Sequence, residues 1–146
     1  QPIGFKIDPY EMVFRLVRLH LLVKKDEPLT RENLVETFKK GNFYTGFDVV
    51  GDSSGFRFTS QDGDVTKTMG DEITLSPQTK LTASAPQPAR FVVFRNGEKF
   101  LEFTDTAEIA VNVTEPASYR VEVYRDALGS PYDKMPWIIS NPIYVR

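Results

Sequence analysis

His20 is the residue best suited to acid–base or metal chemistry, and it is the only histidine among the 146 residues. A site built on two histidines is therefore excluded, and the absence of cysteine removes thiolate ligands and a thiol nucleophile. A Ser–His–Asp relay needs partners that the sequence does not visibly supply around His20. We interpret His20 as a helix residue that packs or hydrogen-bonds.

The acidic residues give one further candidate site. Asp62-Gly63-Asp64 could offer carboxylates to calcium, with Asp71 and Glu72 if the fold brings them near. The segment lacks the spaced ligands and bidentate glutamate of an EF-hand, whereas Asp and Gly are the residues that a tight turn selects. We expect a plain turn, and hence no catalytic, cofactor-binding or metal-binding residue in this chain.

Aromatic side chains could stack on sugars if they were exposed on a sheet. Strand alternation groups Tyr119 with Val121 and Val123, and Trp137 with Ile139, which favours core positions for both aromatic residues. We predict core or interface roles for most of the set, which comprises Tyr10, Tyr44, Tyr119, Tyr124, Tyr132, Trp137 and Tyr144.

Composition limits the partners. With 40% hydrophobic and 26% charged residues the chain can bury a normal core, and a net charge of -2 gives no basic footprint for nucleic acid. The most apolar run, Met12 to Val23, contains Arg15, Arg18 and His20, so we expect no membrane span. The lack of an initial methionine suggests a fragment, a processed product or an engineered boundary.

Two helices are expected before residue 46. Asp8-Pro9-Tyr10-Glu11 has the form of a helix start, and the predicted helix runs from Pro9 to Leu22 with apolar residues on nearly every side, as in a helix buried on several sides. Thr30 can cap a second, amphipathic helix that runs to about Lys40 and stops at Gly41.

From Asn42 onward the apolar period changes to two, which predicts β-strands. Asn96-Gly97 suits a type I′ turn, so we expect a hairpin between 90–95 and 98–103, and we expect a further turn at Pro86-Gln87-Pro88. Roughly seven or eight short strands are typical of a sandwich. The predicted fold is mainly β, an immunoglobulin-like antiparallel β-sandwich preceded by two α-helices, with a helical segment 1–45 and a sandwich domain 46–146.

Several segments together resemble the C-terminal portion of bacterial PHP-domain (polymerase and histidinol phosphatase) metal-dependent hydrolases of the CehA/McbA type. The most specific is the closing Trp-Ile-x-Ser-Asn-Pro-Ile-Tyr run, and the resemblance covers nearly the whole chain. The segments are Ile7-Asp8-Pro9-Tyr10-Glu11, Phe14-Arg15, Val17-Arg18 and His20, Gly41-Asn42-Phe43-Tyr44, Phe47-Asp48, Gly55-Phe56-Arg57-Phe58, Met69-Gly70-Asp71-Glu72, Tyr119-Arg120-Val121-Glu122 and Pro136 to Tyr144.

The resemblance implies an N-terminal catalytic domain that holds divalent metals with motifs such as His-x-His, followed by a β-sandwich tail. This chain contains none of those motifs, so it resembles the tail plus the last helices of the catalytic domain, and no family metal ligand maps onto it. The family also suggests a bacterial periplasmic or exported location. Hydrolysis is expected of a full-length parent, and not of these 146 residues.

Ser140-Asn141-Pro142 interrupts the final strand-like run. Proline cannot donate to a sheet ladder, so we predict a bulge at which the last strand restarts, with an architectural role.

Two functions follow: an accessory module of a metallohydrolase, whose partner is the catalytic domain of the same parent, or an independent binding module for carbohydrate or protein. The first helix could also mediate a homo-oligomer. Its interface candidates are Tyr10, Phe14, Val17 and Leu21.

Overall fold

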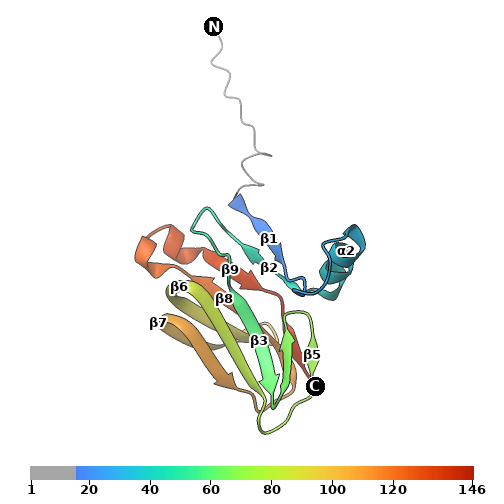
Figure 1. Cartoon of the computed structure of the whole chain (residues 1–146). Helices are drawn as coiled ribbons and strands as arrows, with labels where there is room; N and C mark the ends of the chain where they lie inside the picture. Colours follow the sequence, from blue (N-terminus) through green and yellow to red (C-terminus); the bar gives the residue numbers. More distant parts are fainter. Residues whose placement is uncertain (1–15) are drawn as a thin grey trace.

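The computed structural model describes residues 16–146, which form a curled, mainly antiparallel sheet with one α-helix beside it (Figure 1). The helix, α2, spans Arg31–Lys40, and two short 3-10 helices, η1 (Asp126–Leu128) and η2 (Tyr132–Lys134), follow the eighth strand. The strands are β1 (Arg18–Leu21), β2 (Phe43–Gly46), β3 (Arg57–Asp62), β4 (Val65–Thr68), β5 (Glu72–Ile73), β6 (Lys80–Arg95), β7 (Glu98–Asn112), β8 (Ala117–Tyr124), β9 (Pro136–Ser140) and β10 (Ile143–Val145).

The main path through the sheet is β1-β2-β9-β8-β6-β3-β4. β7 pairs with β6, and β10 pairs antiparallel with β8 and parallel with the short strand β5. The sheet curls into a half-barrel (Figure 1). Residues from its two ends, β1–β2 and β3–β4, line one pocket. The mainly β prediction is confirmed.

The long β6–β7 hairpin produces the curl. Asn96 (φ 51°) and Gly97 (φ 86°) form its tip, which confirms the predicted tight turn. The first part of β6 pairs with β3 and the last part with β8, while β7 follows both parts. Pro86-Gln87-Pro88, where we expected a turn, lies inside β6 at a register shift between Ser84 and Ala89. Proline removes ladder donors there, so the strand bends without ending.

The second predicted helix is confirmed, including both ends. Thr30 Oγ1 accepts a hydrogen bond from the Asn33 amide at 3.2 Å, and Gly41 closes the helix in the left-handed conformation with φ 77°.

The first predicted helix, Pro9 to Leu22, is wrong from Val17 onward, so residues 17–146 contain the one α-helix α2 and not the end of a second. Residues 9–15 lie outside the described residues, Leu16 is helical, and 18–21 form β1 paired with β2. The alternation of Val17, Leu19 and Leu21 with Arg18 and His20 already had a period of two, and β2 supplied the partner that made it a strand. The expected boundary at residues 45 and 46 falls within β2, which also pairs with β9.

The core is one cluster of buried side chains that is rich in aromatic residues. Tyr119 and Trp137 are 1% and 0% exposed, which confirms their predicted core positions. The other large, fully buried side chains include Phe56, Phe58, Phe91, Met69, Leu81, Ile138 and Ile143.

The predicted bulge at Ser140-Asn141-Pro142 is confirmed by the register of the neighbouring strand. Glu122 pairs with Ile139 and Tyr119 pairs with Ile143, so the three residues between Ile139 and Ile143 oppose two on β8. Ser140 Oγ accepts the hydrogen bond of the buried Val121 amide at 2.8 Å. The serine side chain therefore satisfies a ladder donor that the bulge would otherwise leave unpaired.

The same bulge fastens two distant turns. Asn141 Nδ2 donates to the Gly41 carbonyl oxygen at 2.9 Å, and the Pro142 carbonyl oxygen accepts from the Gly70 amide at 2.8 Å. Asn42 Nδ2 completes the contact by donating to Met69 O at 2.6 Å. We call these three segments, 41–42, 69–71 and 140–142, the bulge joint.

Candidate functional site

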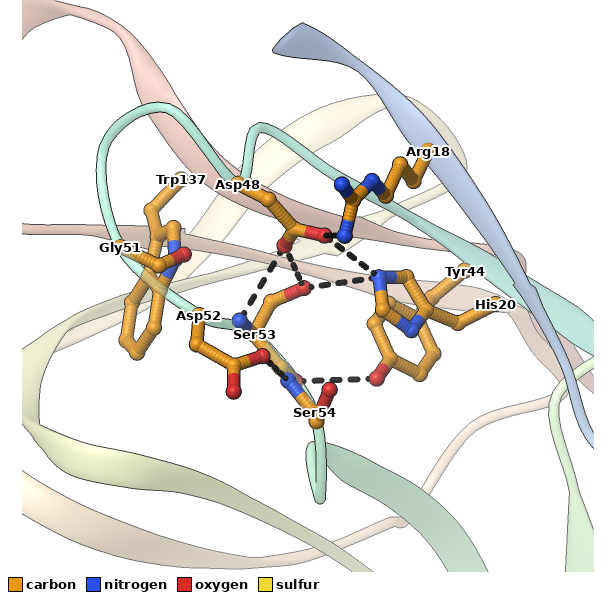
Figure 2. A network of polar contacts seen from close by, with 9 residues as sticks. All are labelled: Arg18, His20, Tyr44, Asp48, Gly51, Asp52, Ser53, Ser54 and Trp137. Atoms are coloured by element: carbon orange, nitrogen blue, oxygen red, sulfur yellow. Dashed lines mark hydrogen bonds and ion pairs between the residues drawn. The ribbon is translucent and has the colours of Figure 1, made fainter. Parts of the chain in front are cut away.

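The only histidine lies in a polar network that joins β1 to the segment 48–53 (Figure 2). His20 Nε2 is 3.2 Å from Asp48 Oδ2 and 3.1 Å from Ser53 Oγ. Ser53 Oγ donates to Asp48 Oδ1 at 2.6 Å, and the Ser53 amide donates to the same oxygen at 3.2 Å. Arg18 Nη1 lies 3.6 Å from Asp48 Oδ2. We call Arg18, His20, Asp48 and Ser53 the His20 network.

Strand alternation and two neighbouring residues position this network. β1 turns Arg18 and His20 to one face, where the His20 ring stacks on Tyr44 with centroids 4.6 Å apart. Tyr44 donates its hydroxyl to the Ser53 carbonyl oxygen at 2.9 Å. A Cβ at Gly46 would overlap the Ser53 hydroxyl and lie 3.0 Å from both Asp48 Oδ1 and His20 Nε2. The missing side chain at residue 46 therefore makes room for the network.

The carboxylate of Asp48 is the charge that the network stabilises, and its side chain is 8% exposed. Burial acts to raise the pKa of Asp48, but hydrogen bonds from the Ser53 hydroxyl and amide, together with His20, outweigh burial and lower the pKa. Burial also raises the pKa of Tyr44 to about 12. At neutral pH the network thus holds an ionised aspartate beside a neutral phenol.

The arrangement differs from a nucleophilic relay. In such a relay the aspartate and the serine bind opposite nitrogens of the imidazole, and the base removes the serine proton. Here Asp48 and Ser53 both face Nε2, and the Ser53 hydroxyl donates a hydrogen bond to Asp48. Ser53 is also 0% exposed. The contacts cross-link β1 to the 47–53 loop, and the Ser53 hydroxyl is directed to the Asp48 carboxylate.

The sequence-based expectation that His20 lacked serine and aspartate partners was wrong. Asp48 and Ser53 are 28 and 33 residues from His20 along the chain, and only the pairing of β1 with β2 brings them to the ring. The sequence held one indirect signal for Asp48, because Phe47-Asp48 is among the segments of the family resemblance. Nothing in its spacing pointed to Ser53.

An open pocket of about 390 Å³ lies next to the network. It is bordered by the end of β1 and by β2 on one side, and by the start of β3 and the end of β4 on the other. Tyr44 and Phe56 line it but are 3% and 1% exposed, so neither presents a ring face on which a sugar could stack. The remaining lining residues are His20, Leu21, Leu22, Ser54, Gly55, Arg57, Thr59 and Thr68.

The other candidates are dispersed. Gly63 and Asp64 form the turn between β3 and β4, and Asp62 accepts a hydrogen bond from Ser76 Oγ at 2.8 Å. Asp71 accepts from the Thr68 amide at 3.0 Å. Within residues 16–146, no three acidic or histidine side chains are grouped as metal ligands.

The interface candidates divide into two pairs. Tyr10 and Phe14 lie outside the described residues. Val17 is 38% exposed, and Leu21 is half-buried. Leu21 ends the edge strand β1, Val17 immediately precedes that strand, and neither lies in a helix.

The comparisons with known proteins add no relative: no family model, curated protein or solved structure matches the chain. The helix found in the described part of the chain does not have the length and hydropathy needed to cross a membrane.

Proposed function

We propose that this chain is a non-catalytic C-terminal accessory domain of a larger PHP-type metal-dependent hydrolase. The observation that carries the proposal is that segments of the family resemblance contact one another in the fold. Gly41-Asn42, Met69-Gly70-Asp71 and Ser140-Asn141-Pro142 are far apart in sequence, yet they meet in the bulge joint. Residues that fasten a fold are expected in a supporting module.

The His20 network and Trp137 extend the same reasoning. Arg18 and His20 contact Asp48, so two further segments of the resemblance also meet each other. Trp137 Nε1 donates to the Gly51 carbonyl oxygen at 2.6 Å, which ties the closing run to the 47–53 loop. Each of these residues has a role in holding the sheet together.

We place the start of the module at β1, before the boundary expected from the sequence, because β1 and β2 belong to the sheet. In this proposal the fold is an immunoglobulin-like sandwich whose two layers share the bent β6–β7 hairpin. Divalent metals and the hydrolytic chemistry belong to a catalytic domain elsewhere in the parent chain, and that domain is the module's main partner. The location that accompanies the family is the bacterial periplasm or the cell exterior.

An independent binding module remains the second candidate, because the pocket beside His20 is open and combines Arg57 with the hydroxyls of Thr59 and Thr68. Its buried aromatic rings favour a peptide or another polar partner over a stacked sugar. Histidine-rich metal motifs encoded upstream of residue 1 in the gene would favour the accessory role. A gene without them would favour the binding module.

The proposal is tested with the purified chain. We expect no stoichiometric zinc, manganese or iron by metal analysis and no turnover of phosphodiester or carbamate substrates. A fluorophosphonate probe should leave Ser53 unlabelled, because its hydroxyl is buried and hydrogen-bonded to Asp48. Chelator-sensitive turnover, or a probe adduct on Ser53 that disappears in Ser53→Ala, would contradict a non-catalytic role.

A further inference from the structure

We infer that the free edge of β1 pairs with β1 of a second copy of this chain, antiparallel and centred on Leu19. The inference is independent of the proposed function, since it depends only on this edge. Within residues 16–146, β1 has β2 as its one strand partner, and its other edge lies at the end of the sheet path. An unpaired strand edge is a template for another strand.

The hydrogen bonds between β1 and β2 determine which backbone amides and carbonyls of β1 are available at its free edge. The Leu22 amide donates to the Asn42 carbonyl oxygen at 2.9 Å, so the amide and carbonyl of Leu22 face β2. Because these groups alternate along a strand, those of Arg18 and His20 also face β2, and those of Leu19 and Leu21 face the free edge. Val17 immediately precedes β1, and in the proposed dimer the strand extends by this one residue, so that its amide and carbonyl also face the free edge.

The side chains make this edge self-complementary in one register. With Leu19 opposite Leu19 of the second copy, Val17 lies opposite Leu21, and each of these is a hydrogen-bonded pair. The register places apolar side chains against apolar side chains on the outer face. Val17 and Leu19 are 38% and 52% exposed in one chain, so pairing would remove apolar surface from water.

The edge also lacks the features that usually block such pairing. β1 contains no proline or bulge, and its one charged residue, Arg18, is directed toward Asp48 and not across the edge. On the inner face, the same register sets Arg18 opposite His20 of the second copy. Arg18 and His20 each lie next to the Asp48 of their own chain, so a carboxylate accompanies the Arg18 charge on both sides of the axis.

The size of the contact sets its strength. A standard interface buries roughly 800 Å² on each partner, and a strand of four residues covers only part of that area. The dimer is therefore weak, and its population should rise with protein concentration.

A cysteine placed on the twofold axis tests the register. The chain has no cysteine, so Leu19→Cys introduces a single thiol. Opposed residues in a hydrogen-bonded antiparallel pair have Cα atoms about 5.5 Å apart, which a disulfide can bridge. Under mild oxidation Leu19→Cys should form a covalent dimer at least about tenfold faster than the control Val65→Cys. A tenfold ratio of the two rates corresponds to about 1.4 kcal/mol. Val65 is 51% exposed on the opposite edge strand, β4.

The off-axis pair gives a second readout. A mixture of Val17→Cys and Leu21→Cys chains should cross-link as a heterodimer faster than either variant alone, since these positions face each other only between copies in this register. Sedimentation of the wild-type chain should show a concentration-dependent dimer that Leu19→Lys abolishes and Val65→Lys leaves unchanged. Equal cross-linking of Leu19→Cys and Val65→Cys, as expected if residues 1–15 or another partner cover the edge, would overturn the inference.

Discussion

Asn141 donates its side-chain amide to the carbonyl oxygen of Gly41 at 2.9 Å, across a separation of 100 residues. Gly41 ends α2, so the bond joins the bulge between the last two strands to the terminus of the helix. The same carbonyl oxygen also accepts from the Phe43 amide at 2.8 Å, so one local and one distant donor satisfy it at the helix end. The bulge joint is therefore a tertiary cap, and its integrity should control the stability of the whole domain.

Gly70 gives the sharpest test of the bulge joint. A Cβ at this residue would lie 2.6 Å from the Gly41 carbonyl carbon and closer still to the Lys40 carbonyl oxygen. Gly70→Ala should lower the free energy of unfolding by about 2 kcal/mol or more, because rigid backbone must move. The matched control is Gly55→Ala, at a similar φ (+94° against +88°) but with open space around it. Equal denaturant midpoints for the two variants would show that the contact is unimportant.

The hairpin tip predicts a second stability effect. Gly97 has φ 86° and open space around it, so the cost of a side chain there is conformational and not steric crowding. Gly97→Val should destabilise the domain by roughly 1 kcal/mol or more, because a β-branched residue rarely adopts positive φ. Gly97→Asn, which tolerates this conformation better, should cost clearly less. Urea denaturation measures both, and an unchanged midpoint for Gly97→Val would argue against the turn.

Asp48 should make stability depend on pH on the acid side. Its pKa in the folded chain is lowered below the ordinary 3.8, so its contribution is fully present above that value and is lost as pH falls through the folded pKa. Asp48→Asn should cost about 1–3 kcal/mol at pH 7, where it removes a buried, hydrogen-bonded charge. The difference in free energy of unfolding between the wild type and Asp48→Asn should shrink below about pH 4. A difference that stays constant from pH 7 to pH 3 would contradict the role of this charge.

Tyr44 should make the stability of the fold depend on pH in the alkaline range. Its pKa rises from 10.0 to about 12 on folding, so the unfolded chain ionises first and stability is lost as pH rises from 10 toward 12. Tyr44→Phe should cost about 1 kcal/mol at pH 8 through loss of the hydrogen bond to Ser53. That cost should diminish, or change sign, by pH 11. The pKa of Tyr124 is also raised to about 12, so the wild type and Tyr44→Phe share the loss of stability that Tyr124 causes at high pH.

Local chemistry within the sequence was sufficient for several elements. The cap at Thr30 and the stop at Gly41 defined α2, and Asn96-Gly97 defined the hairpin, because each signal acts within a few residues. Pro142 predicted the restart of the last strand for the same reason, since a missing amide donor is a property of one residue. The alternation around Tyr119 and Trp137 predicted their burial.

Contacts between distant segments decided the rest. The segment from Arg18 to Leu21 fitted a helix from its apolar content and became a strand because β2 offered it an edge. Pro86-Gln87-Pro88 became a bend within β6 because β7 continues along the strand beyond it. His20, Asp48 and Ser53 met only through the pairing of β1 with β2 and the space left by Gly46. Local propensity is a weak preference, and the backbone hydrogen bonds and buried area that a tertiary partner provides outweigh it.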